Sequence, residues 1–260
     1  MLAEQYLFVQ VSSGHVRGQL WVNGCTAWQA WDARPTVTRT PVAPFMRPVG
    51  NELTLLLSDA APPREGPASK EEPYLELELG LAGFDAPAQE FAVIFSYTWT
   101  DEDSRLGPEP LTRVVEHRLD LPDARAWAWD RGRALDEERD RRGIETVVAK
   151  LHGLIEKRDT KELVKMLALK HTELATGWRA SRDDVEGEIL GELADLYAEP
   201  DFTVEPLRLD RLLLERRCGG RLVHVRDMDG RPPIRATAAG KAFALPLGLA
   251  CLDDAWLVVR

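Results

Sequence analysis

The segment Tyr74-Leu-Glu-Leu-Glu-Leu79 decides the fold class of the first half of this 260-residue chain. Its leucines alternate with glutamates, which places the leucines on one side of an extended chain and the glutamates on the other. Other β-rich segments surround it, at residues 6–11, 19–22, 25–31, 52–57, 90–100 and 112–119. Asn23-Gly24 suits a type I′ hairpin, because both turn positions need a positive φ. The pattern predicts a β-sandwich over residues 1–120.

Residues 143–197 follow a helical period. Apolar residues recur there at every third or fourth position, beginning with Ile144, Val147, Val148, Leu151, Leu154 and Ile155. Asp159 and Ser181 are each followed three positions later by an acidic residue, and they predict the starts of two further helices. The charged residues 121–142 predict a linker and the solvated start of the first helix.

Residues 211–260 return to a period of two. Turn residues at 218–220, 229–230 and 253–254 separate segments that predict four or five antiparallel strands. Together with the helices, these strands predict an α+β domain over residues 143–260. The expected fold is therefore an all-β sandwich followed by an α+β domain.

Composition and charge narrow the classes of function. The chain has 33 Lys and Arg against 43 Asp and Glu, a net charge of −10. Residues 1–120 hold 9 basic and 17 acidic residues, so −8 of that charge lies in the first half. Such a balance disfavours nucleic-acid binding by phosphate neutralisation. No apolar run approaches the ~18–20 residues that cross a bilayer, and residues 1–11 do not resemble a signal peptide. We expect a cytoplasmic protein with no nucleic-acid or membrane partner.

The motifs of cofactor, metal and nucleophile chemistry are absent from the sequence. There is no H-E-x-x-H, no C-x-x-C and no EF-hand loop, and the three cysteines are scattered. Neither Gly-rich phosphate loop is present, nor is a G-x-S-x-G elbow. We expect no cofactor and no metal, assign no catalytic residue, and favour a protein that is not an enzyme.

Four polar residues are candidates for lining a ligand pocket. His224 and Arg226 alternate with valines on one predicted strand, and Arg235 lies on the next. With Tyr197 from the last helix, they could surround a cavity for an anion or a carbonyl group. The alternative, which we favour, is the solvated face of a half-buried sheet covered by arginine stems.

Tryptophans and an acidic cluster are candidate contacts to a partner. Trp28 and Trp31 are three positions apart on one predicted strand and point to opposite faces, so one of them is expected to be exposed. Trp21 and Trp99 either fill the sandwich core or are exposed aromatics that contact a sugar or a partner protein. The cluster Asp101-Glu102-Asp103 is either a solvated loop or a surface that attracts a basic partner.

The second half resembles the nuclear-transport-factor-two-like (SnoaL-like) superfamily. The matching segments are Ile155-Glu-Lys-Arg-Asp159, Gly220-Arg-Leu-Val223, Asp229-Gly-Arg-Pro-Pro-Ile-Arg235 and Asp253-Asp-Ala-Trp-Leu-Val258. The resemblance implies a cone-like domain with three helices on one curved antiparallel sheet. The superfamily includes isomerases, dehydratases, hydrolases and non-enzymatic binders, so the fold alone implies no single function.

The first half carries a second resemblance in Leu20-Trp-Val-Asn-Gly24 and Pro44-Phe-Met-Arg-Pro-Val-Gly-Asn-Glu-Leu53. With these segments, the whole chain is similar to proteobacterial two-domain proteins of toxin and immunity loci. The resemblance implies an immunity-type protein that neutralises a secreted bacterial toxin, of the type VI secretion or polymorphic class, by occlusion. Its partner would be a cognate protein such as a basic toxin domain. The alternative is a small-molecule-binding protein or an enzyme using the cone cavity, and the sequence leaves the oligomeric state open.

Overall fold

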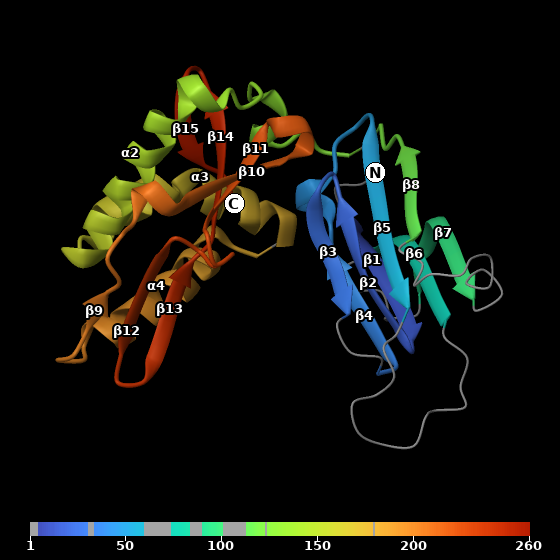
Figure 1. Ribbon diagram of the computed structural model, residues 1–260, viewed down its shortest axis with the longest axis horizontal. Coiled ribbons are helices and arrows are strands. Elements are labelled where there is room, and N and C mark those ends of the chain that lie inside the picture. The colour runs from blue at the N-terminus through green and yellow to red at the C-terminus, as the bar shows by residue number, and fades with distance from the viewer. Residues whose placement is uncertain are drawn as a thin grey trace. The chain divides into compact units, whose positions relative to one another are not determined.

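The computed structural model describes residues 5–30, 34–59, 74–83, 90–100, 113–122, 124–178 and 180–260. The chain divides into two compact units, Met1–Arg125 and Ala126–Arg260. The described residues form three α-helices and four antiparallel sheets, and most of the elements are strands (Figure 1). Each unit has a hydrophobic cluster of its own.

The first unit forms two four-stranded antiparallel sheets, with strand orders β4-β1-β6-β7 and β3-β2-β5-β8. The strands are β1 (Gln5–Gly14), β2 (Val16–Val22), β3 (Cys25–Ala30), β4 (Thr36–Pro41), β5 (Asn51–Asp59), β6 (Tyr74–Gly83), β7 (Ala92–Thr100) and β8 (Arg113–Leu119). One buried cluster draws on both sheets, with leucines of β6 and β5 among its members. The predicted alternation in β6 is confirmed, because Leu75, Leu77 and Leu79 are buried while Glu76 is exposed.

Strand β4 was not predicted from the sequence. All six of its residues are exposed or half-buried, so its side chains do not alternate between a core and solvent. A strand without a buried face lacks the period-two signal on which the other predictions depended.

Two buried asparagines join the first hairpin to the loop that precedes β5. Asn23 and Gly24 have φ values of 50° and 77°, as the predicted type I′ turn requires. The Asn23 side-chain amide donates to Asn51 Oδ1 at 2.9 Å and to the Phe45 carbonyl at 2.6 Å. Asn51, which has no exposed surface, donates to the Arg47 carbonyl at 2.6 Å. The segments 20–24 and 44–53, which carried the second resemblance, are therefore in direct contact.

The second unit contains helices α2 (Glu137–Glu156), α3 (Thr160–Trp178) and α4 (Arg182–Tyr197). Both predicted caps are confirmed. The Glu162 amide donates to Asp159 Oδ1 at 3.2 Å, and Ser181 and Asp184 form a reciprocal capping box. No helix in the described residues is both long enough and apolar enough to span a bilayer.

The strands of the second unit form two sheets where one was expected. Their orders are β10-β11-β14-β15 and β13-β12-β9. The strands are β9 (Thr203–Val204), β10 (Leu212–Arg217), β11 (Leu222–Asp227), β12 (Ile234–Ala238), β13 (Lys241–Leu245), β14 (Leu247–Leu252) and β15 (Ala255–Val258). Pro246, which has no N–H to donate to a ladder, separates β13 from β14. As a result β13 pairs with β12, whereas β14 pairs with β11.

Most of the expected linker, residues 121–142, lies within the second unit. Trp129 has no exposed surface, and the Ala128 amide donates to Glu173 Oε1 of α3 at 2.6 Å. Asp140 is only 3% exposed, and Arg133 binds both of its carboxylate oxygens at 2.6 and 2.7 Å. The predicted solvated start of the helix is confirmed for residues 136–139, which are exposed, whereas Asp140 is buried because Arg133 and Arg139 pair with it.

Candidate functional site

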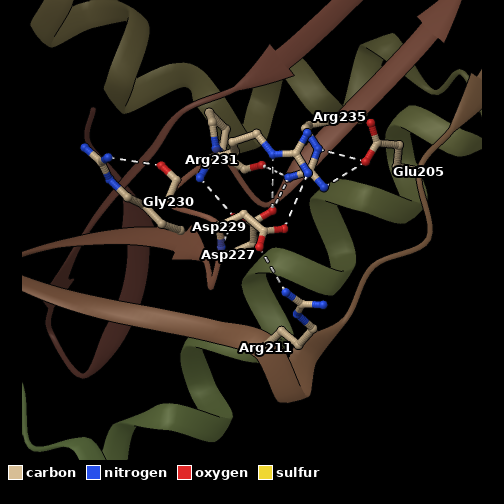
Figure 2. Close-up of polar contacts among 9 residues, drawn as sticks. Glu205, Arg211, Asp227, Asp229, Gly230, Arg231 and Arg235 are labelled. Carbon is tan, nitrogen blue, oxygen red and sulfur yellow. Dashed lines mark hydrogen bonds and ion pairs between the residues drawn. The ribbon is translucent and has the colours of Figure 1, made fainter.

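A small pocket lies beside the β11–β12 turn of the second unit. Figure 2 shows the polar contacts around this turn. The pocket has a volume of about 80 Å³, and its lining consists of Pro206, Leu207, Arg208, Arg211, Leu212, Asp227, Asp229, Pro233 and Arg235. Drug-sized ligands occupy pockets of roughly 300–1,000 Å³. This pocket therefore has room for a few waters or one small polar group.

Arg235 is the one predicted pocket residue that lines this space, and its guanidinium is already engaged. Its Nε and Nη2 lie 2.8 and 2.7 Å from Glu205 Oε2, and Nη1 donates to Asp227 Oδ2 at 2.5 Å. Nη1 also donates to the Pro232 carbonyl at 2.7 Å. These contacts, above all the one with Glu205, raise the pKa of Arg235. Arg235 thus holds β12 to the β11–β12 turn and to residue 205.

Asp227 organises the turn itself, as Figure 2 shows. Its Oδ1 accepts hydrogen bonds from the amides of Asp229 and Arg231, both at 2.9 Å. Burial alone would raise the pKa of Asp227, but these amides and the Arg235 guanidinium outweigh it and lower the pKa. Asp227 is therefore ionised at neutral pH and is unsuited to act as a general acid.

The charges around the pocket balance. Arg211, Arg231 and Arg235 share one network of ion pairs with Glu205, Asp227 and Asp229, and Arg208 forms a separate pair with Asp210. Arg211 lies 3.2 Å from Asp229, and Arg208 lies 3.3 Å from Asp210. With no net charge, the network attracts neither an anion nor a cation strongly. Within the described residues, no three His, Cys, Asp or Glu side chains are grouped as a metal site would require.

His224 belongs to a different part of the unit. The predicted alternation on its strand is confirmed, because Val223 and Val225 are in the core cluster while His224 is on the other face. Burial, with Arg217 and Arg226 nearby, lowers the pKa of His224 to about 4. The imidazole is thus neutral at physiological pH and has no proton to spare for general-acid chemistry.

The other two predicted pocket residues also have partners elsewhere. Tyr197 donates its hydroxyl to the Ile155 carbonyl at 3.1 Å, and Arg226 donates to the Gly230 carbonyl at 3.1 Å. Of the four candidates, only Arg235 therefore lines this pocket, and the cavity interpretation, which the sequence analysis did not favour, gains no support here. Tyr197 and Arg226 reach other partners from α4 and β11, whereas Arg235 of β12 contacts Asp227 of β11 directly.

Among the predicted partner contacts, Trp28 is in the core and only 5% exposed. A β-bulge causes this burial. The register shifts between Leu20, opposite Trp28, and Trp21, opposite Thr26, so that Ala27 and Trp28 both turn inward. Trp31 and the cluster Asp101-Glu102-Asp103 lie outside the described residues.

The sequence left open whether Trp21 and Trp99 are in the core, and the structure separates them. Trp99 is 5% exposed and belongs to the core cluster. Trp21 is half-buried and is absent from that cluster. It shares an outer face with Thr26 and Thr54, its partners in the two neighbouring strands.

An apolar surface at the start of β7 was missed in the sequence analysis. We call residues 91–94 the edge patch. Val93 is 49% exposed and Ile94 is 38% exposed, while the Phe91 ring packs edge-on against Phe8 with centroids 5.1 Å apart. A register shift opposite Leu79 and Gly80 adds one residue to β7 and leaves Ile94 unpaired. The unbroken apolar run of residues 91–95 was the available signal.

Comparisons with known proteins found no matching family model, no matching curated protein and no matching solved structure.

Proposed function

We propose that this chain is a non-enzymatic protein-binding module, and specifically an immunity-type protein that occludes a secreted bacterial toxin of the type VI secretion or polymorphic class. In this proposal the first unit is a β-sandwich domain and the second a cone-like domain of the SnoaL-like type. The edge patch on β7 is the observation that carries the proposal.

The edge patch has the properties of a binding surface. Edge strands of soluble proteins are normally protected by charges, prolines or covering segments, because their free backbone groups invite pairing. Ala92, Val93 and Ile94 are instead three consecutive exposed apolar residues. A run of this kind at the edge of a sheet is a recurrent site of protein association.

The charge of the first half supports a basic partner. Residues 1–120 carry a net charge of −8. Such a surface attracts a basic domain at long range and speeds the encounter. The pocket beside Arg235 gives the small-molecule alternative little support, because it is small and its charged side chains are paired with one another.

The test is calorimetric titration of the chain with the toxin domain encoded by the neighbouring gene, at low and at high salt. We expect a one-to-one complex that weakens as salt screens the charges, and inhibition of the toxin in the same mixture. Val93→Lys should weaken the complex. Val49→Lys should not, because Val49 is 64% exposed in the same unit but lies outside the edge patch. Absence of a complex with the toxin at low salt would contradict the proposal.

A further inference from the structure

We infer that β7 accepts an extended basic segment of the partner as an added strand, whose lysine or arginine side chains reach Glu76 and Glu78 across Ser96 and Thr98. This inference rests on the proposed function, and it specifies the chemistry of the partner at the edge patch.

Strand β7 has one described neighbour. It pairs with β6 from Tyr74 opposite Thr100 to Leu81 opposite Ala92, and it ends the sheet β4-β1-β6-β7 within the described part of the chain (Figure 1). The free side of such a strand presents a row of amide and carbonyl groups. An incoming strand can pair with that row, as in other cases of β-strand addition.

The inward side chains of β7 hold the strand in position. Trp99 is buried, and Phe95 and Tyr97 pack against the core cluster. The Phe95 ring also stacks on His117 of β8, with centroids 4.1 Å apart. A strand fixed in this way is a preformed template, so binding does not have to order it first.

A row of unneutralised acids lies one strand behind the free edge. Glu76 is opposite Thr98 and Glu78 is opposite Ser96, so these four side chains share the outer face of the sheet. Within the described residues neither glutamate forms an ion pair; the Gln10 side-chain amide donates to Glu78 at 3.2 Å. The nearby Arg39 is directed elsewhere, to Gln10 Oε1 at 2.7 Å and over the Phe8 ring at 4.2 Å.

The spacing of strands fits basic side chains on an added strand. Adjacent strands are about 4.8 Å apart, so an added strand would lie about 10 Å from β6. Serine and threonine are short, and they leave the path above β7 open at positions 96 and 98. A long lysine or arginine side chain can extend over them to meet Glu78 and Glu76, with its aliphatic stem lying along the sheet.

The same charges disfavour a second copy of this chain as the occupant. Edge-to-edge pairing of two β7 strands would bring two sets of Glu76 and Glu78 toward each other, and like charges at such positions are destabilising. The apolar residues Val93 and Ile94 favour apolar residues at the corresponding end of the partner segment. The expected occupant is therefore a segment that alternates basic and apolar residues.

The probe for this inference is a labelled, end-blocked synthetic peptide that alternates valine and lysine. Two control peptides are used, one alternating valine and glutamate and one with prolines in the valine–lysine sequence. Fluorescence anisotropy measures binding to the full chain, and hydrogen exchange locates it. We expect the valine–lysine peptide to bind and to protect amides of residues 92–100. The opposite edge strand, residues 36–41, should exchange as before.

A charge-matched pair of variants tests the role of the two glutamates. The double variant Glu76→Gln/Glu78→Gln should raise the peptide Kd about fivefold to tenfold, as expected for the loss of two cross-strand charge pairs. The double variant Glu52→Gln/Glu116→Gln changes the net charge equally on the other sheet, where both residues are exposed, and should have little effect. Circular dichroism checks that both variants fold.

Several outcomes would overturn the inference. They are equal binding of the lysine and glutamate peptides, protection outside residues 92–100, equal effects of the two double variants, or protection in the free monomer of those β7 amides that point away from β6. A dimer that protects residues 92–100 without peptide would make a second copy the occupant. A toxin complex that leaves β7 unprotected would refute strand addition but not the proposed function. Peptide binding at β7 without a toxin complex would refute the proposed function but not strand addition.

Discussion

Replacing Lys170 by methionine tests the energetics of a buried charge in the second unit. Lys170 is 5% exposed, and its ammonium donates to the Pro246 carbonyl at 2.9 Å. Burial, together with the nearby Arg260, lowers the pKa of Lys170 from 10.5 to about 8. At neutral pH this lysine is charged in both the folded and the unfolded states, so the folded state bears the cost of burying the charge.

The size and sign of that cost follow from the pKa difference. Each pKa unit corresponds to 1.36 kcal/mol, so a shift from 10.5 to about 8 corresponds to roughly 3 kcal/mol. Between these two values the folded state binds fewer protons than the unfolded state. The lysine's contribution to stability therefore rises with pH in this window, by about 2.5 kcal/mol from pH 7 to pH 10. At pH values below the lower of these two pKa values, the contribution of Lys170 to stability no longer changes with pH.

Urea unfolding of both proteins at about pH 7 and about pH 10 provides the measurement. We expect Lys170→Met to raise the free energy of unfolding by about 1–3 kcal/mol at pH 7, because the Pro246 carbonyl can bond to water after the lysine is lost. The difference in free energy of unfolding between Lys170→Met and wild type should be lower by about 2.5 kcal/mol at pH 10 than at pH 7. Lys161→Met, at an exposed position of the same helix, is the control. A difference between Lys170→Met and wild type that is the same at both pH values would refute the reasoning.

Two further substitutions test buried polar contacts. Asn51→Ala removes a side chain that donates to the Arg47 carbonyl and accepts from Asn23. The substitution should lower the free energy of unfolding, measured in urea, by about 2–4 kcal/mol. A loss below ~0.5 kcal/mol would show that this hydrogen-bond network does not stabilise the fold. The Arg133 guanidinium holds the pKa of Asp140 well below its usual range, so the stabilisation by Asp140 is present above about pH 4 and is lost as pH falls further. Asp140→Asn should therefore destabilise the chain by about 3 kcal/mol at neutral pH and by less at about pH 3, as measured by thermal unfolding at both pH values. Equal destabilisation at the two pH values would show that the Asp140 charge is not the source of the stabilisation.

The local elements of the fold were largely predictable, because their signals lie within a few consecutive residues. The caps at Asp159 and Ser181 depend on contacts three residues apart, and the alternation of residues 74–79 is a property of any extended chain. Strand β4 and the two-residue β9 escaped prediction because neither has a clear buried face.

The candidate site was much less predictable. Arg235 was correctly placed on a strand, but the carboxylates that bind it come from residues 205 and 227, and their convergence depends on how separate strands pair. The edge patch depends on a bulge and on β7 being the last strand of its sheet within the described residues. The burial of Trp28 likewise depends on a bulge, because strict alternation predicted only that Trp28 and Trp31 face opposite sides and left open which of them is buried.

The sequence by itself determined the three helices, most of the strands, where the helices begin, and that the first half is acidic. The tertiary structure alone decided which sheet each strand joins, which tryptophans are buried and which strand edge is exposed. The physical reason is the range of the interactions. Periodicity and capping act between residues three or four apart, whereas register, bulges and sheet order are set by hydrogen bonds and packing between residues far apart in the chain.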